Sequence, residues 1–181
     1  MPPPVIKAGP LTLRPFGEDD IGWVCQVSQD PAIQANLVEV FDPCRTEHAA
    51  YFVRDLAGTA WDDGRRAEFL VADTAAGTRL GRVGLGLRPY DPGAAEIGYW
   101  MDPRARGRGV ATAATRALCQ WAFTALDLAL IEWHCEVGNV ASRRVAEKAG
   151  FLIEGTLRRR LTHRGQRVDA WVGSLLRPGC S

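Results

Sequence analysis

The feature that most constrains this chain is a glycine-rich turn between a strand-like and a helix-like segment. The turn reads RARGRG at residues 104–109; it follows an alternating segment at residues 95–101 and precedes apolar residues at helical spacing from Val110 to Ala122. Glycines let a backbone approach a ligand, and the free N–H groups at a helix start point along the helix axis. The junction therefore predicts either a pyrophosphate site or an ordinary glycine turn, and its spacing matches neither a P-loop nor a dinucleotide-binding fingerprint.

Hydrophobic periodicity in the rest of the chain predicts an α/β (α+β) domain with a mixed sheet. Strands are expected at residues 11–15, 68–72, 80–88, 95–101, 128–137, 151–161 and 166–176. Helices are expected from residue 18 to about residue 30, from residue 45 with Thr46 as the cap, from residue 110 to 122, and from Asn139 to Gly150. The strands before and after the long helix, at 95–101 and 128–137, should be parallel with a right-handed crossover, whereas the hairpins on both sides should be antiparallel. We therefore expect seven strands, mostly antiparallel.

Composition and charge narrow the class of protein. The 181 residues fit one domain, and 22 Lys and Arg against 21 Asp and Glu give a net charge of +1, too balanced for a general nucleic-acid or membrane-surface binder. The five cysteines are far apart and include no CxxC pair, which argues against a disulfide framework or a zinc ribbon and predicts reduced, mostly buried thiols. Without an apolar run of about 18 residues or a signal-peptide pattern, we expect a cytoplasmic protein with no metal and no membrane or nucleic-acid partner.

Six short blocks resemble motifs of the GNAT superfamily of N-acyltransferases, and their surroundings resemble its RimJ/RimL-like subgroup. In chain order they are LTLRP at 11–15, EIGYWM at 96–101, RGRGVAT at 106–112, NVAS at 139–142, EKAGF at 147–151 and EGTLR at 154–158. The resemblance implies a single GNAT domain over residues 1–181, ordered from about 10 to 176, whose sheet splays around an acyl-CoA cleft with helices on both faces. It also implies direct acyl transfer, most simply of acetyl from acetyl-CoA, to a primary amine such as a protein N-terminal α-amine or a small-molecule amine.

The resemblance further implies which residues contact acyl-CoA. Backbone groups near Trp100 and Met101 would hold the pantetheine arm like an added strand, and Asn139 would lie against the same arm. The pyrophosphate would lie on the turn, where arginine charge serves it or the 3′-phosphate. The residues that match this motif are Arg104, Arg106, Gly107, Arg108, Gly109, Val110, Ala111 and Thr112. Any one of these arginines could instead be a solvated turn residue.

Two residues are candidates for the general base. An amine must be neutral to attack a thioester, yet reference pKa values of about 10.4 for lysine and about 7.7–8.0 for an α-amine leave it mostly protonated near pH 7. Glu96 is the first candidate, because it lies on an alternating face of residues 95–101 and several relatives place a catalytic glutamate there; the alternative is a solvent-facing strand carboxylate. His134 is the second candidate, between Glu132 and Glu136 on the polar face of its strand, and its alternative is a structural pair with a neighbouring carboxylate.

Ser142 is the candidate acid. Asn139 and Ser142 have the spacing of an N-cap and the third helical residue, which capping alone would explain. The resemblance adds that Ser142 would lie near the sulfur, where its hydroxyl could protonate the leaving thiolate. Many GNAT enzymes use a tyrosine one helical turn further on, but this chain has Ala146 there, so more weight falls on Ser142.

The sequence leaves the identity of the acceptor and of its binding residues open. Aromatic residues could line the acceptor site or belong to the core: Trp23, Phe41, Trp61, Trp100 and Trp171. The basic residues near the last hairpin, at 158–160, 163, 164 and 167, could attract a CoA phosphate, an acidic peptide or rRNA, or could be surface residues. A non-catalytic acyl-CoA-binding regulatory domain and a longer donor such as succinyl-CoA are alternative functions. Family members are often dimers, so the resemblance allows a homodimer.

Overall fold

The computed structural model describes residues 3–36 and 44–179. In these residues one eight-stranded sheet runs in the order β1-β2-β3-β4-β5-β6-β8-β7. The strands are β1 (Ile6–Ala8), β2 (Leu11–Arg14), β3 (Arg66–Asp73), β4 (Arg79–Leu87), β5 (Ala94–Met101), β6 (Leu130–Glu136), β7 (Leu152–His163) and β8 (Gln166–Leu176). Neighbours pair antiparallel, except that β5 and β6 are parallel. The expected mixed, mostly antiparallel sheet is confirmed.

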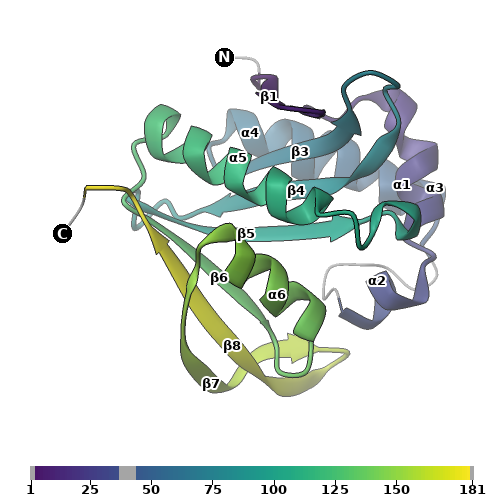
Figure 1. Cartoon of the computed structure of the whole chain (residues 1–181). Helices are drawn as coiled ribbons and strands as arrows, with labels where there is room; N and C mark the ends of the chain where they lie inside the picture. Colours follow the sequence, from purple (N-terminus) through teal and green to yellow (C-terminus); the bar gives the residue numbers. More distant parts are fainter. Residues whose placement is uncertain (1–2, 37–43, 180–181) are drawn as a thin grey trace.

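Helices cover both faces of this sheet, as expected (Figure 1). The α-helices are α1 (Ile21–Val27), α2 (Pro31–Asn36), α3 (Thr46–Tyr51), α4 (Ala60–Asp62), α5 (Val110–Ala125) and α6 (Val140–Ala149). Short 3₁₀ turns η1 (Glu18–Asp20) and η3 (Pro103–Ala105) precede α1 and the glycine-rich turn, and η2 (Phe52–Thr59) is a π-helical segment between α3 and α4. In the described part of the chain, no helix is long and apolar enough to span a membrane.

Three local expectations were wrong. The strand count is eight because the proline-rich N-terminus contributes β1, which pairs with β2. The first helix ends at Val27, three residues before Asp30. The residue before a proline disfavours helical geometry, so Asp30 lies between two helices: its side chain accepts a hydrogen bond from the N–H of Ile33 at 3.0 Å, and α2 begins at Pro31. Thr46 is the first residue of α3 and not its cap: the N–H of the preceding Arg45 donates to His48 Nδ1.

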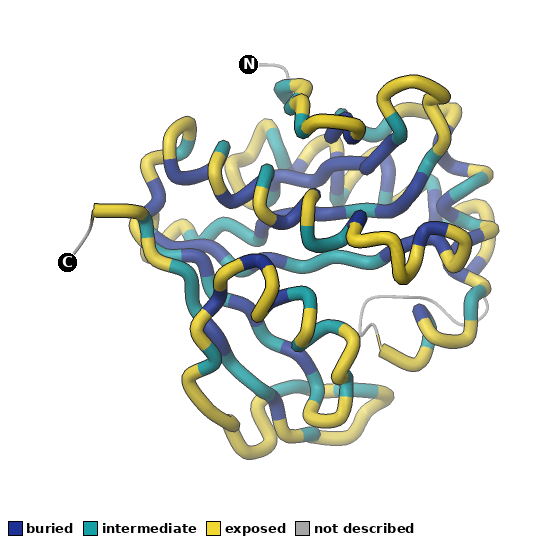
Figure 2. The backbone as a smooth tube through the Cα atoms, in the orientation of Figure 1, coloured by how far each residue is buried: buried dark blue, intermediate teal, exposed yellow. Residues whose placement is uncertain are grey.

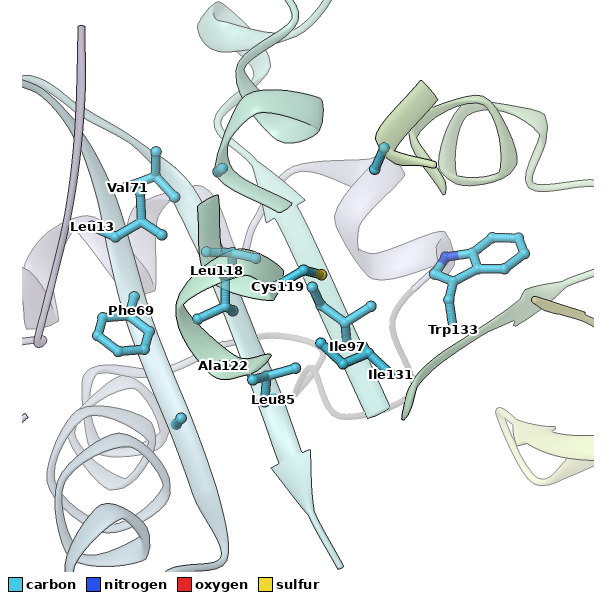
Figure 3. Close-up of a cluster of buried hydrophobic side chains, with 14 of the residues drawn as sticks. Leu13, Phe69, Val71, Leu85, Ile97, Leu118, Cys119, Ala122, Ile131 and Trp133 are labelled. Atoms are coloured by element: carbon cyan, nitrogen blue, oxygen red, sulfur yellow. The ribbon is translucent and has the colours of Figure 1, made fainter. Parts of the chain in front are cut away.

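The main hydrophobic core lies between α5 and the sheet. Leu118 and Ala122 of α5 are fully buried against sheet residues such as Leu85 and Ile97 (Figure 3). The 3.6-residue spacing of α5 directs these side chains to one face, which removes apolar area from water at roughly 25 cal/mol per Å². The buried stretches of the central strands in Figure 2 follow from this packing. The core fixes the positions of β5 and β6, which carry the candidate catalytic residues.

Strands β5 and β6 separate part-way along their length. Their parallel ladder joins Ala94 through Ile97 to Leu130 through Trp133, and in the described residues it goes no further. Beyond it, β5 stays paired with β4 as far as Met101, while β6 stays paired with β8 as far as Glu136. The two strands therefore diverge, as Figure 1 shows. Residues 98–101 line the opening between them.

Four of the five cysteines lie in the described residues, and all four are free thiols. Cys44, Cys119 and Cys135 are buried and Cys25 is half-buried, which agrees with the expectation of mostly buried thiols. Burial raises the pKa of Cys119 and of Cys135 to about 12, so neither forms a thiolate near pH 7. Cys180 lies outside the described residues.

Candidate active site

A cavity of about 940 Å³ lies at the opening between β5 and β6. It is lined by the ends of both strands, the glycine-rich turn, the starts of α5 and α6, helix α3 and the β7–β8 hairpin. This volume falls in the range of small-molecule and cofactor sites. All three candidate catalytic residues line it: Glu96, His134 and Ser142.

The glycine-rich turn presents an open backbone surface to this cavity. Gly107 and Gly109 have φ angles of +72° and +76°, and a Cβ atom on either would meet no atom within 4 Å. Gly109 is the N-cap of α5, so the N–H groups of Val110, Ala111 and Thr112 have no acceptor inside the helix. The helix dipole adds partial positive charge at the same place. The turn thus has the geometry of an anion site, which is more than an ordinary glycine turn requires.

The three arginines of the turn have different environments. Arg106 lines the cavity, pairs with Asp30 and donates from Nε to the carbonyl of Met101 at 3.2 Å. Arg104 is 78% exposed and pairs with Asp102 in a separate surface hollow; hydrogen bonds from Arg104 hold the pKa of Asp102 at about 2 against the effect of burial. Arg108 is exposed and does not line the cavity. Of these three arginines, only Arg106 is therefore positioned to bind an anion in the cavity.

Glu96 and His134 form a pair across the diverging strands. The carboxylate Oε1 of Glu96 lies 3.4 Å from His134 Nδ1; the His134 side chain is 6% exposed and that of Glu96 44%. Burial raises the pKa of Glu96, but the hydrogen bond and charge of His134, with the charges of Arg88 and Arg160, outweigh it and lower the pKa below 4.5. Glu96 is therefore an ionised carboxylate at neutral pH that faces the cavity. His134 does pair with a carboxylate, and that carboxylate is the other candidate base.

Ser142 belongs to a hydrogen-bonded network that joins three elements. Asn139 Oδ1 accepts from the N–H of Ser142 at 3.1 Å, so the expected N-cap is present. Trp133 Nε1 donates to Ser142 Oγ at 3.1 Å, and Oγ donates to the hydroxyl of Tyr99 at 3.2 Å. The Tyr99 hydroxyl in turn donates to the carbonyl of Ser142 at 2.9 Å, and burial raises the pKa of Tyr99, which keeps it protonated. The Ser142 hydroxyl is thus held in place by Trp133 and Tyr99.

Comparison with known proteins identifies the family. The sequence profile of the acetyltransferase (GNAT) domain matches residues 10–152. The chain is a GNAT acetyltransferase. The predicted family and fold class are confirmed, and with them an acyl-CoA-dependent acetyltransferase activity.

Some proteins similar to this GNAT acetyltransferase match most of its length. It is 28% identical over 169 residues to an uncharacterized N-acetyltransferase, p20, of Bacillus licheniformis, which covers 92% of this chain and 93% of the relative. It is similar to a GNAT acetyltransferase of Bacillus anthracis (TM-score 0.83, 25% identity, 96% and 98% coverage). Its fold also matches RimL, a ribosomal L7/L12 alpha-N-protein acetyltransferase solved with coenzyme A (TM-score 0.85, 21% identity, 96% and 98% coverage). The expected RimJ/RimL-like neighbourhood is therefore present.

The expected aromatic residues contribute little to the cavity of this acetyltransferase. Trp100 lines the cavity and packs against Trp23 with ring centroids 5.4 Å apart, but Trp23 itself lies in the hollow beside Arg104. Trp61 packs on Phe69 and Trp121 in the core. Trp171 lies under the guanidinium of Arg143. Phe41 lies outside the described residues.

Sequence reasoning missed Tyr99 and Trp133. Both lie on the strand face opposite the candidate bases. Tyr99 alternates with Glu96, Gly98 and Trp100, and Trp133 alternates with Glu132 and His134. The signal was the family block at 96–101 itself, which contains Tyr99. The hydrogen bonds to Ser142 depend on how α6 packs on the sheet, which periodicity does not report.

Proposed function

We propose that this GNAT acetyltransferase moves the acetyl group of acetyl-CoA directly to a primary amine. The observation that carries the proposal is that an ionised carboxylate, Glu96, and a fixed hydroxyl, Ser142, line one cavity at the opening between β5 and β6. A proton acceptor and a proton donor are the two groups that amine acylation by a thioester needs. Two thiols, Cys44 and Cys135, also line the cavity, but burial raises the pKa of each, which makes both poor nucleophiles for a covalent intermediate.

The donor would lie along the opening with its pyrophosphate on the turn. The amides of residues 107–112 and the positive end of α5 supply hydrogen bonds and partial charge, and Arg106 adds a full charge once it leaves Asp30. The unpaired backbone edge of residues 98–101 would hold the pantetheine amides as a neighbouring strand would. Asn139, Ala111 and Thr112 line the same space. The fold similarity to RimL, which was solved with coenzyme A, supports this placement.

Glu96 would act as the base. Its lowered pKa keeps the carboxylate ionised above about pH 4.5, so it is ready to accept a proton from the acceptor ammonium, directly or through one water. The neutral amine nitrogen then forms a bond to the thioester carbonyl carbon. The almost fully buried His134 pairs with this carboxylate, with Nδ1 3.4 Å from Glu96 Oε1.

Ser142 would act as the acid. When the C–S bond breaks, Ser142 Oγ gives its proton to the thiolate. The acceptor nitrogen starts as an ammonium and ends as an amide, so it loses two protons through Glu96: one passes to solvent, and the other returns to Ser142 through solvent. The products are the N-acetyl amine, the CoA thiol and one released proton. In this structure the Oγ proton points to Tyr99, and a rotation about the Cβ–Oγ bond redirects it. Trp133 Nε1 keeps the oxygen itself in place during that rotation.

The test is CoA thiol release with acetyl-CoA or succinyl-CoA across a panel of α-amines, lysine side chains and polyamines. We expect release that depends on the amine and is faster with acetyl-CoA. Tight acetyl-CoA binding with no amine-dependent release from any member of the panel would point to the regulatory-domain alternative. Faster release from succinyl-CoA would assign the longer donor.

A further inference from the structure

The last hairpin contains a distortion that faces the cavity. Leu157 of β7 pairs with Ala170 of β8, and Leu161 pairs with Val168, so the three residues 158–160 lie opposite Asp169 alone. The N–H of Arg159 donates to Asp169 Oδ1 at 2.8 Å, and Arg159 has a φ of +50°, a conformation that non-glycine residues rarely adopt. Bulges of this kind redirect side chains, and backbone strain concentrates at functional sites.

The bulge brings basic residues to the cavity wall. Arg160, His163 and Arg167 line the cavity, whereas Arg158 and Arg159 do not. Arg167 Nη1 donates to the carbonyl of Arg160 at 3.1 Å, which braces the backbone at this point. Arg160 lies close enough to Glu96 for its charge to lower the pKa of that carboxyl. The sequence pattern alone did not distinguish these residues from an ordinary surface strand.

Two polar groups on this wall have unused hydrogen-bonding capacity. Arg160 is an exposed residue at the rim of the cavity, and within residues 3–36 and 44–179 its guanidinium has neither an ion pair nor a hydrogen bond, in contrast to Arg106 on Asp30 and Arg88 on Glu132. His163 is 14% exposed; its Nδ1 lies 2.7 Å from Glu136 Oε2, and its Nε2 is buried with no partner among the same residues. Buried polar atoms are almost always satisfied, so His163 Nε2 needs a partner that the described residues do not supply, such as a water molecule or a ligand group.

A second part of the cavity lining is largely apolar, although it also contains His48 and Tyr51. It comes from α3 and η2, where Ala49, Phe52 and Leu56 face the same space. An acceptor in the cavity would thus meet apolar surface from these elements and positive charge from the β7–β8 hairpin, and Glu96 lines the same space. A guanidinium without a partner matches a carboxylate, because its planar donors bind two oxygens at once.

We propose that the bulge of β7 forms the acceptor subsite, in which Arg160 binds a carboxylate next to the acceptor amine. The inference rests on the proposed function and adds the class of acceptor: an α-amine with a carboxylate close to it. Two sources share this chemistry, a free α-amino acid and a peptide N-terminus followed by an acidic residue.

Two matched pairs of acceptors separate these sources. One pair is L-leucine and L-leucinamide; the other is the amidated peptide Ala-Asp-Ala and its Asn counterpart. For each acceptor, kcat/KM is measured with wild-type enzyme, with Arg160→Gln, and with Arg158→Gln as a control from the same bulge outside the cavity. Each acceptor is compared with itself between enzymes, so differences in amine basicity cancel.

We expect Arg160→Gln to lower kcat/KM about tenfold for the carboxylate member of at least one pair, mainly through KM, and to change its amide partner less than twofold. The pair whose carboxylate member loses activity identifies the acceptor as a free α-amino acid or as a peptide N-terminus followed by an acidic residue. Arg158→Gln should leave all values within twofold, and acetyl-CoA affinity by calorimetry should be unchanged in Arg160→Gln. Equal effects on both members of each pair, or weaker acetyl-CoA binding, would overturn the inference and leave the proposed function standing. If wild-type enzyme acetylates no amine at all, the proposed function fails and takes this inference with it.

Discussion

Trp133 Nε1 donates a hydrogen bond to Ser142 Oγ at 3.1 Å, so a fully buried indole of the sheet fixes the hydroxyl at the start of α6. Figure 3 shows Trp133 on its strand at the edge of the core. Because core packing immobilises the indole, the position of Oγ is determined by the fold and not by a mobile side chain. This gives Ser142 the fixed geometry that a proton donor needs.

Ser142→Ala should lower kcat about 100-fold, within the range of general acid catalysis, with acetyl-CoA affinity changed less than twofold. The variant also leaves Trp133 Nε1 without its acceptor, which should cost about 1–3 kcal/mol of unfolding free energy. Trp133→Phe keeps most of the ring and the Ser142 hydroxyl, so its loss of kcat should be smaller. A folded Ser142→Ala enzyme that matches wild type in the pre-steady-state chemical step would exclude the acid role.

Gly109→Val should weaken acetyl-CoA binding at least tenfold in calorimetry, because a branched side chain would fill the open face of the turn. The matched control is Gly77→Val in the turn between β3 and β4. Gly77 has a similar φ of +68° and an equally open surrounding, so it incurs the same strain away from the cavity. Equal acetyl-CoA affinity in Gly109→Val and Gly77→Val would show that the pyrophosphate lies elsewhere.

The pH dependence should separate the base from the amine. Since the pKa of Glu96 is lowered below 4.5, its deprotonation is complete near pH 7, and any rise of kcat/KM between pH 6 and 9 should follow the pKa of the amine supplied. Glu96→Gln should lose about 100-fold in kcat/KM at pH 7 and recover in part at high pH, where neutral amine is abundant. His134→Ala should change little.

The control for that profile is to repeat it with a second amine whose pKa differs from that of the first. A rising limb that stays fixed when the amine changes would assign the limb to the enzyme. If Glu96→Gln keeps wild-type kcat/KM at pH 7 while His134→Ala loses it, the base is His134. If neither variant loses activity, bulk water or an already neutral amine removes the need for a base.

Asp20 should make stability depend on acid pH. Burial raises its pKa, but hydrogen bonds from Arg14 and Arg79 and from the N–H of Gly17 outweigh this and lower the pKa from 3.8 to about 2. A depressed carboxyl pKa contributes stability above pH 3.8 that is lost as the pH falls towards 2. Asp20→Asn should therefore cost about 2 kcal/mol in urea unfolding at pH 7 and less at pH 3, whereas Asp19→Asn on the surface should cost little at either pH. A pH-independent difference would contradict this assignment.

The sequence could predict the order of the elements and the anion-binding turn, because both depend on local periodicity and on glycines that need positive φ. Contacts between elements that are far apart in the sequence could not be predicted from it. One local contact was missed as well: the motif marks Arg104 as a CoA-binding arginine, yet its guanidinium pairs with Asp102, two residues away. The bulge at residues 158–160 reads as an ordinary surface strand, because its register depends on the pairing of Leu161 with Val168.

The central claim is a direct transfer in which Glu96 removes the proton of the amine. The most direct measurement is a single turnover with excess enzyme, acetyl-labelled acetyl-CoA and an amine that the panel identifies, in wild-type enzyme and Glu96→Gln at pH 7. The account predicts that label passes from CoA to the amine with no label on the protein, and that the transfer step is about 100-fold slower in Glu96→Gln at unchanged acetyl-CoA affinity. Label that accumulates on the protein before it reaches the amine, or equal transfer rates in the two enzymes, would contradict it.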